Sequence, residues 1–125
     1  MHTCRLLVVD NEKNLGLLYK EELEDDGYEV EVVNSGKKAL QLFDAKSFDL
    51  VIMDIFEHGI NGIEIMRKMY HGNRTIPVII NTGYPPFNES FMEIEAVGFV
   101  VKSFDLSELK RKIRELITPK CLMNH

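Results

Sequence analysis

The amino-acid sequence predicts an open, doubly wound α/β domain: a five-stranded parallel sheet in the order 2-1-3-4-5 with helices on both faces. Two observations predict this fold class. Short apolar runs alternate with segments of helical periodicity five times along the chain, which is typical of parallel strands joined by crossover helices. The run at residues 49–54, Asp-Leu-Val-Ile-Met-Asp, is apolar on both sides of its pleat, as expected for a central strand covered on both faces.

Length and composition narrow the class of protein. The 125 residues suit a single domain over 1–125, with a core at 4–118 and a short C-terminal tail. A net charge of -5 disfavours direct binding to nucleic acid or to an anionic membrane, because both need a cationic footprint. The first apolar run, residues 6–9, is too short for a signal peptide or a membrane span, so we expect a cytoplasmic protein. Cys4 and Cys121 are then expected to be thiols.

The N-terminal half is expected to contain three strands and two helices. A buried strand at residues 6–9 ends in polar residues that can cap a helix continuing to Asp26. Residues 28–33 alternate apolar and acidic side chains, the pattern of a half-exposed edge strand. Ser35 is placed to cap a second helix, after which the central strand at residues 49–54 begins.

The C-terminal half continues the alternation. After the central strand we expect a loop at 55–60 and then a helix from Gly62, with Met66 and Met69 as core residues. A strand at 77–80, a helix within 87–96 and a strand at 98–101 are expected to follow in this order. Asp105 and Glu108 are spaced as a capping box for the last helix. That helix has a strong apolar face, formed by Leu106, Leu109, Ile113, Leu116 and Ile117.

Polar side chains follow each of the buried strands. They are Asp10 and Asn11, Asp54, Thr82 and Lys102. Because the carboxyl ends of parallel strands share one edge of a sheet, these residues are expected to line a single crevice. Carboxylate and amide oxygens suit Mg²⁺, the lysine supplies positive charge and the threonine hydroxyl can donate a hydrogen bond. A phosphoryl group fits such a site, and an aspartate can accept it as an acyl phosphate.

The chain resembles a response-regulator receiver domain of two-component signalling over essentially its whole length. The matching segments are residues 7–12, residues 49–54, Gly62 eight positions after Asp54, residues 78–83 and residues 99–104. Each segment is weak evidence alone, but all five in this order are highly specific. The resemblance implies a flavodoxin-like fold and a phosphoacceptor that has at most slow autodephosphorylation, rather than an enzyme.

The resemblance also implies roles for individual residues. Asp54 would accept a phosphoryl group from a histidine kinase or a histidine phosphotransfer protein. Mg²⁺, or Mn²⁺ in its place, would be held by Asp10, Asn11, Asp54 and the backbone carbonyl of Phe56. Thr82 and Lys102 would contact the phosphoryl oxygens, and Phe99 would be the rotating aromatic of the switch. A downstream protein would read the face formed by residues 87–96, the strand at 98–101 and the last helix, where Phe91, Met92 and Phe104 are available.

The chain departs from the family pattern at several positions. Asn11 stands where a second acidic residue is usual, so the pocket has one formal negative charge fewer. His58 and Ser103 stand where prolines are usual, and Ser103 follows the lysine. Phe56 and Tyr84 occupy positions that tune hydrolysis, and these aromatic rings are expected to shield the acyl phosphate from water.

Three alternatives compete with a phosphorylated switch. A receiver-like module that binds proteins without being phosphorylated stays open, given Asn11 and Ser103. An aspartate-dependent phosphatase needs a second aspartate two residues after the nucleophile, where Phe56 stands. A flavodoxin-type cofactor binder needs a glycine- and hydroxyl-rich loop after the first strand, where residues 10–12 are Asp-Asn-Glu.

Overall fold

The computed structural model describes residues 3–54, 62–71, 76–83 and 98–121, and its sheet has the predicted topology. The strands are β1 (Arg5–Val9), β2 (Glu29–Val33), β3 (Leu50–Met53), β4 (Val78–Thr82) and β5 (Gly98–Val101). They form one sheet in the order β2-β1-β3-β4-β5, and every neighbouring pair is parallel. The predicted fold class and strand order are therefore confirmed.

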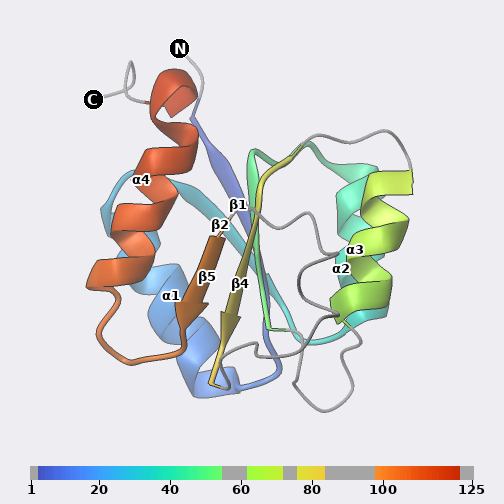
Figure 1. Cartoon of the computed structure of the whole chain (residues 1–125), viewed down its shortest axis with the longest axis horizontal. Coiled ribbons are helices and arrows are strands. Elements are labelled where there is room, and N and C mark those ends of the chain that lie inside the picture. The colour runs from blue at the N-terminus through green and yellow to red at the C-terminus, as the bar shows by residue number, and fades with distance from the viewer. Residues whose placement is uncertain (1–2, 55–61, 72–75, 84–97, 122–125) are drawn as a thin grey trace.

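Helices cover both faces of the sheet, as Figure 1 shows. The described helices are α1 (Lys13–Asp25), α2 (Gly36–Ala45), α3 (Gly62–His71) and α4 (Ser107–Cys121). Helices α1 and α4 pack on one face and enclose one apolar cluster, whereas α2 and α3 pack on the other face around a second cluster. The helix expected within residues 87–96 lies outside the described residues. The tail expected from Thr118 is wrong, because α4 continues to Cys121.

Local capping explains where the first helices begin and end. The Ser35 hydroxyl accepts the Lys38 backbone N–H at 3.2 Å and so caps α2, as predicted. Helix α1 ends at Asp25, and Gly27, which follows the C-cap residue Asp26, has a positive φ of 97° that suits a residue without a Cβ atom. Gly16 inside α1 permits a close approach to β2, because a Cβ atom there would lie 2.9 Å from the Val32 Cγ1 atom.

The start of α4 differs in detail from the predicted capping box. The Asp105 carboxylate accepts the backbone N–H of Ser107 at 3.0 Å and its hydroxyl at 2.6 Å. These bonds lower the pKa of the exposed Asp105 carboxyl. The Asp105 backbone N–H donates to the Ser103 hydroxyl at 3.0 Å, which is the role that the prediction gave to the Glu108 side chain.

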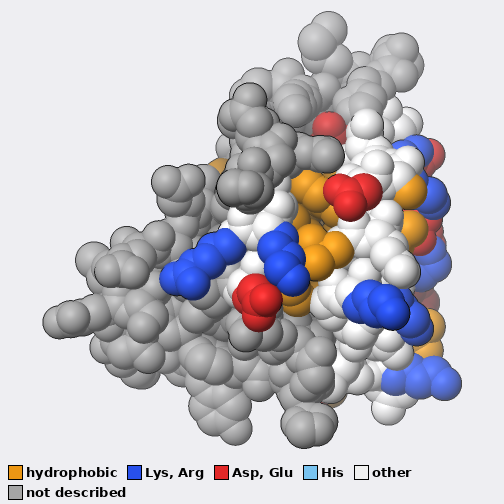
Figure 2. Space-filling view, turned by 90° about the vertical axis from the view of Figure 1, so that its right-hand side faces the viewer, with side chains coloured by type: hydrophobic (Ala, Val, Ile, Leu, Met, Phe, Trp, Pro, Cys, Tyr) orange, Lys and Arg blue, Asp and Glu red, His pale blue; other side chains and the backbone are white. Residues whose placement is uncertain are grey.

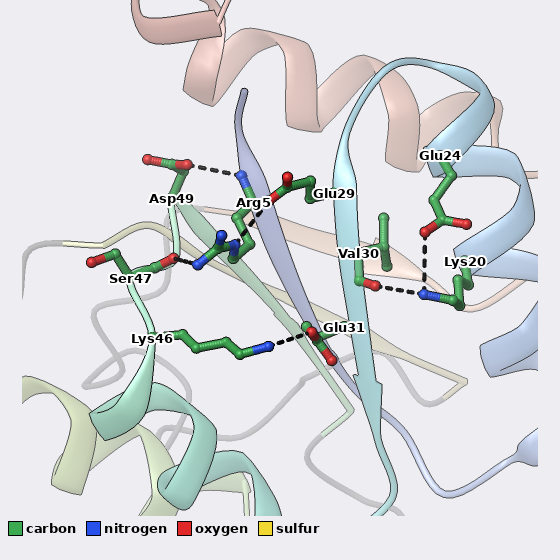
Figure 3. Close-up of polar contacts among 9 residues, drawn as sticks. All are labelled: Arg5, Lys20, Glu24, Glu29, Val30, Glu31, Lys46, Ser47 and Asp49. Atoms are coloured by element: carbon green, nitrogen blue, oxygen red, sulfur yellow. Dashed lines mark hydrogen bonds and ion pairs between the residues drawn. The ribbon is translucent and has the colours of Figure 1, made fainter. Parts of the chain in front are cut away.

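The edge strand β2 is surrounded by charged side chains, which Figure 3 shows. The Lys20 Nζ atom of α1 donates to the Val30 backbone carbonyl at 2.9 Å and pairs with Glu24 at 3.1 Å. Lys46, after α2, pairs with Glu31 at 2.7 Å. Lysines and ion pairs at a sheet edge disfavour the addition of another strand. The half-exposed edge strand that the alternation predicted is therefore confirmed.

The side of the molecule that carries α2 and α3 has a mixed surface. Figure 2 shows charged side chains of both signs on it, with hydrophobic side chains between them. Leu40, Leu42 and Ile76 are partly buried against the apolar cluster on this face. Within the described ranges, no helix combines the length and the apolar character needed to cross a membrane.

The expectation of two free thiols is wrong. Cys4 is disulfide-bonded, and the described part of the chain contains no free cysteine. The other cysteine of the sequence is Cys121, at the end of α4, so we expect Cys121 to be the partner of Cys4. Such a bond would join the segment before β1 to the last helix.

We predict that reduction destabilises the domain. Opening the bond between Cys4 and Cys121 restores the freedom of nearly the whole unfolded chain, so the free energy of unfolding should fall by about 2–4 kcal/mol. Denaturant titrations with and without a reductant measure this loss. Cys121→Ser is the matched control, because its stability should not respond to the reductant. Two thiols that react with maleimide in the unreduced, denatured protein would contradict the assignment.

Candidate functional site

The register of the sheet places the predicted site residues along one edge. Val9 pairs with Met53 across β1 and β3, so the next residue of each strand, Asp10 and Asp54, emerges beside the other. At the opposite end of β3, Asp49 fixes this register. Its carboxylate accepts the Arg5 backbone N–H at 2.8 Å, and its own backbone N–H donates to the Arg5 carbonyl at 2.8 Å.

Lys102 directly follows β5, which is an edge strand of the sheet, and its side chain reaches the two acids. Strand β5 pairs Val101 with Thr82 of β4, and the Lys102 backbone N–H donates to the Thr82 carbonyl at 2.8 Å. The Lys102 Nζ atom lies 2.8 Å from Asp54 Oδ2 and 3.0 Å from Asp10 Oδ2. One ammonium group therefore bridges the carboxylates that follow β1 and β3.

These groups are held away from bulk water. Asp10 is 3% exposed, and Asp54 and Thr82 are each 2% exposed. The Lys102 side chain is 8% exposed. Burying a charge is costly unless it is paired, so the two acids and the lysine stabilise one another. The described residues contain no cis peptide bond, and Lys102 reaches Asp54 although Ser103 replaces the usual proline.

The surroundings of the Asp10 carboxyl group change its pKa. Burial raises the pKa of Asp10 above its ordinary value of 3.8, against the hydrogen bonds from Glu12 and Lys102, which lower it. The nearby charge of Asp54 adds to the rise. Burial is therefore the main cause of the raised pKa of Asp10, and Lys102 opposes it.

The sequence indicated a role for Glu12 only as one of the polar residues that can cap the first helix, whereas the structure brings its side chain to the site. Its side chain is 52% exposed and its Oε1 atom lies 3.1 Å from Lys102 Nζ. The Glu12 backbone N–H donates to Asp10 Oδ1 at 2.8 Å, which fixes the turn into α1. Asp10, Asn11 and Glu12 line the end of an open groove that runs along α1 to the end of β2. The sequence feature that could have indicated a role for Glu12 in the site is the presence of an acidic residue two positions after Asp10.

Other predicted site residues are placed only in part. Asn11 is half-buried beside Asp10 and lines the same groove. The backbone of Phe99 lies in β5, paired with Ile80, but its side chain is outside the described part of the structure. Phe56, His58 and Tyr84 also lie outside the described residues. Their roles stay predictions.

The oxygen atoms at this edge fit a small, hard cation. Two buried carboxylates converge on one Nζ atom, so they already share a cationic centre, and the Asn11 side chain lies next along the chain. Carboxylate and amide oxygens are the ligands that Mg²⁺ prefers, and Mg²⁺ usually uses only one or two carboxylates. The described residues include no cluster of three or more His, Cys, Asp or Glu side chains suited to a metal ion.

The fold and the site define the chain as a parallel α/β domain with a lysine-bridged acidic pocket at the carboxyl edge of its sheet. A family model for the response regulator receiver domain matches residues 6–114. The chain therefore belongs to the receiver-domain family of two-component signalling, whose members are phosphoacceptors rather than classical enzymes. The resemblance seen in the sequence is confirmed.

Known relatives agree in sequence and in fold. The response regulator ArlR of Staphylococcus saprophyticus is 32% identical over 115 residues, which cover 90% of this chain and 52% of ArlR. The chain thus spans about half the length of the curated relatives it matches. The response regulator TrrA of Thermotoga maritima, solved with Mg²⁺ and BeF, is 38% identical with a TM-score of 0.83, covering 91% of this chain and 99% of TrrA. TrrA in complex with the histidine kinase ThkA is 37% identical with a TM-score of 0.82, covering 92% and 99%.

We predict that Asp10→Asn stabilises the metal-free protein at neutral pH. A carboxyl whose pKa is raised by folding binds more protons when folded, so its contribution to stability falls as pH rises from about 3.8 through the raised value. Asparagine keeps an oxygen that can accept the Glu12 N–H and carries no charge. The melting temperature should rise by a few degrees at pH 7, measured with EDTA, and by less at pH 4. A gain that is equal at both pH values would contradict the burial effect.

Proposed function

We propose that this chain is a phosphorylation-controlled signalling switch that acts in the cytoplasm and accepts a phosphoryl group on Asp54 from a histidine kinase or a histidine phosphotransfer protein. The observation that carries the proposal is the Lys102 ammonium group, buried and shared between Asp54 at 2.8 Å and Asp10 at 3.0 Å. It marks Asp54 as a carboxylate at the end of a buried strand whose charge is balanced by a movable cation.

The proposed chemistry is a phosphoryl transfer between two side chains. A carboxylate oxygen of Asp54 attacks the phosphorus of a phosphohistidine, an O–P bond forms, the N–P bond breaks, and the imidazole leaves with the electron pair of that bond. Lys102 moves its contacts from the Asp54 carboxylate to the new phosphoryl oxygens and balances their charge. The Thr82 hydroxyl donates a hydrogen bond to another phosphoryl oxygen.

A divalent metal belongs to this proposal. Asp10, Asn11, Asp54 and the Phe56 carbonyl would hold Mg²⁺, or Mn²⁺, which screens the repulsion between the carboxylate and the incoming phosphoryl group. The complex of TrrA with Mg²⁺ and BeF supports such a site in a protein that is 38% identical. Asn11 carries no charge, so this chain relies on two carboxylates where the family pattern has three.

The output of the switch is a change of surface. Phosphorylation adds nearly two negative charges at Asp54, toward which Thr82 and Lys102 move, and Phe99 rotates into the space beside β4. A downstream protein would bind the face formed by residues 87–96, β5 and α4, where Phe104 is 76% exposed and Val101 is 53% exposed. The complex of ThkA with TrrA supports a histidine kinase as the upstream partner.

We predict that the purified chain is phosphorylated once, at Asp54. Incubation with phosphoramidate or acetyl phosphate and Mg²⁺ should add one phosphoryl group to the intact mass, and EDTA should prevent it. Asp54→Asn should abolish the modification because an amide is not a nucleophile.

Asp49→Asn is the matched control for this experiment. Asp49 begins the same strand, is 9% exposed and accepts a backbone N–H, which asparagine can also accept. This variant should be modified like the wild-type chain. A wild-type mass that stays unchanged would favour the alternative of a receiver-like binding module that is not phosphorylated.

We predict that Asn11→Asp tightens Mg²⁺ binding by roughly tenfold, because a third carboxylate restores the charge that the pocket lacks. Isothermal titration of both proteins with MgCl₂ measures the two dissociation constants. Equal constants would show that Asn11 does not contribute to the metal site.

We predict that Phe56→Asn and Tyr84→Ala shorten the lifetime of the acyl phosphate by opening it to water. The decay of the phosphorylated mass after removal of the phosphodonor measures the effect. Exposed Lys37→Ala on α2 is the control and should decay like the wild-type protein. Unchanged decay in both aromatic variants would exclude shielding by these rings.

A further inference from the structure

A buried polar pair joins α1 to β4 next to the candidate site. The Asn81 Nδ2 amide donates to the Tyr19 hydroxyl oxygen at 2.5 Å, across 62 positions of sequence. Tyr19 has 0% of its surface exposed and Asn81 has 2%. The bond therefore connects the helix that begins just after Asp10 with the strand residue that directly precedes Thr82.

The surroundings of this pair are apolar. Tyr19 belongs to the cluster between the sheet and helices α1 and α4, whose other members include Leu6, Ile52 and Ile79. An amide and a hydroxyl in such a cluster carry a desolvation penalty unless they bond to each other. Apolar contacts are not directional, whereas this hydrogen bond is satisfied at only one relative placement of α1 and β4.

The hydrogen bond holds Asn81, the residue that directly precedes Thr82 in β4, so it also affects where Thr82 lies. Side chains alternate along β4: Ile79 points into the cluster that contains Tyr19, and Ile80 points into the opposite cluster. Asn81 continues on the Tyr19 side. Only one peptide unit separates Asn81 from Thr82, whose carbonyl accepts the Lys102 backbone N–H at 2.8 Å. A shift of Asn81 is therefore passed on to both proposed phosphoryl contacts.

The charged groups of the pocket also affect the pKa of the Tyr19 hydroxyl. Burial raises the pKa of the Tyr19 phenol well above its usual range, the Asn81 hydrogen bond opposes the rise, and the charges of Asp10, Lys102 and Asp54 act on it as well. The hydroxyl is therefore neutral at any physiological pH. The pair forms a permanent, uncharged link beside the two acids.

We propose that Tyr19 and Asn81 are positioning residues for phosphoryl transfer: their hydrogen bond holds the end of β4 where Thr82 and Lys102 can contact the phosphoryl group on Asp54. Neither residue touches the reacting atoms. The inference rests on the proposed function, because it assigns a task to the pair only if Asp54 is phosphorylated.

The first test removes one oxygen atom. Tyr19→Phe should lower the rate of phosphorylation by phosphoramidate roughly tenfold at saturating Mg²⁺, because small misplacements of reacting groups are costly. The Mg²⁺ concentration that gives half of the maximal rate should not change, since the proposed metal ligands are untouched. In a Thr82→Ala background, Tyr19→Phe should slow the reaction by a smaller factor than in the wild-type chain, because one of the two contacts that it displaces is already absent.

Two further variants separate positioning from general stability. Ile113→Val removes a methyl group from the same cluster on α4, and should lower the melting temperature but leave the rate unchanged. Tyr19→Phe combined with Asn81→Leu replaces the pair by apolar groups, so no buried amide is left unpaired. The double variant should regain the melting temperature that Tyr19→Phe loses and still be phosphorylated slowly.

The outcomes distinguish this inference from the proposed function. A wild-type chain that takes no phosphoryl group would overturn both. A wild-type chain that is modified, with Tyr19→Phe reacting equally fast, would overturn only the inference. The same conclusion follows if Tyr19→Phe slows the reaction equally in the Thr82→Ala background, or if the double variant recovers its rate together with its stability.

Discussion

The buried ammonium group of Lys102 is the charge on which the pocket depends. Asp10 and Asp54 emerge side by side from β1 and β3, and two buried carboxylates so placed would repel each other. Lys102 contacts both, and Glu12 adds a third acid at 3.1 Å. Lys102 reaches them because β5 pairs with β4 and its backbone N–H bonds to Thr82. The acidic pocket therefore exists only when the carboxyl edge of the sheet is assembled.

An aspartate lies next to each end of β3, and the two residues have different roles because they contact different groups. Asp49, at the start of β3, bonds to the backbone of β1 and fixes the register of the two strands. Asp54, after its end, bonds to the Lys102 side chain instead of to a backbone. The buried pair of Tyr19 and Asn81 extends this framework, because it joins the helix that follows Asp10 to the strand that ends at Thr82.

Much of the fold could be predicted because strands that are buried on both faces have a strong pattern. β5 has its predicted bounds, β3 ends at Met53 directly before Asp54, and β2 is the charged edge strand. The errors lie where local signals are weak or misleading. Pro119 is a local signal for a helix end, yet α4 continues to Cys121. The spacing of two cysteines says nothing of the distance between them, so the disulfide of Cys4 was not foreseen.

The apolar runs of the sequence are enough to identify the residue that ends each buried strand, and hence to predict that Asp10, Asp54, Thr82 and Lys102 share one edge of a parallel sheet. The contacts of these residues could be found only from the packed domain. Lys102 meets Asp10 across 92 positions and Asn81 meets Tyr19 across 62, and Glu12 joins the lysine from an exposed turn. The periodicity of apolar residues depends only on residues that are near one another in the sequence. It therefore predicts local conformation and the face of each element that is buried. Contacts between elements depend on register and helix placement, which are set by the packing of both apolar clusters at once.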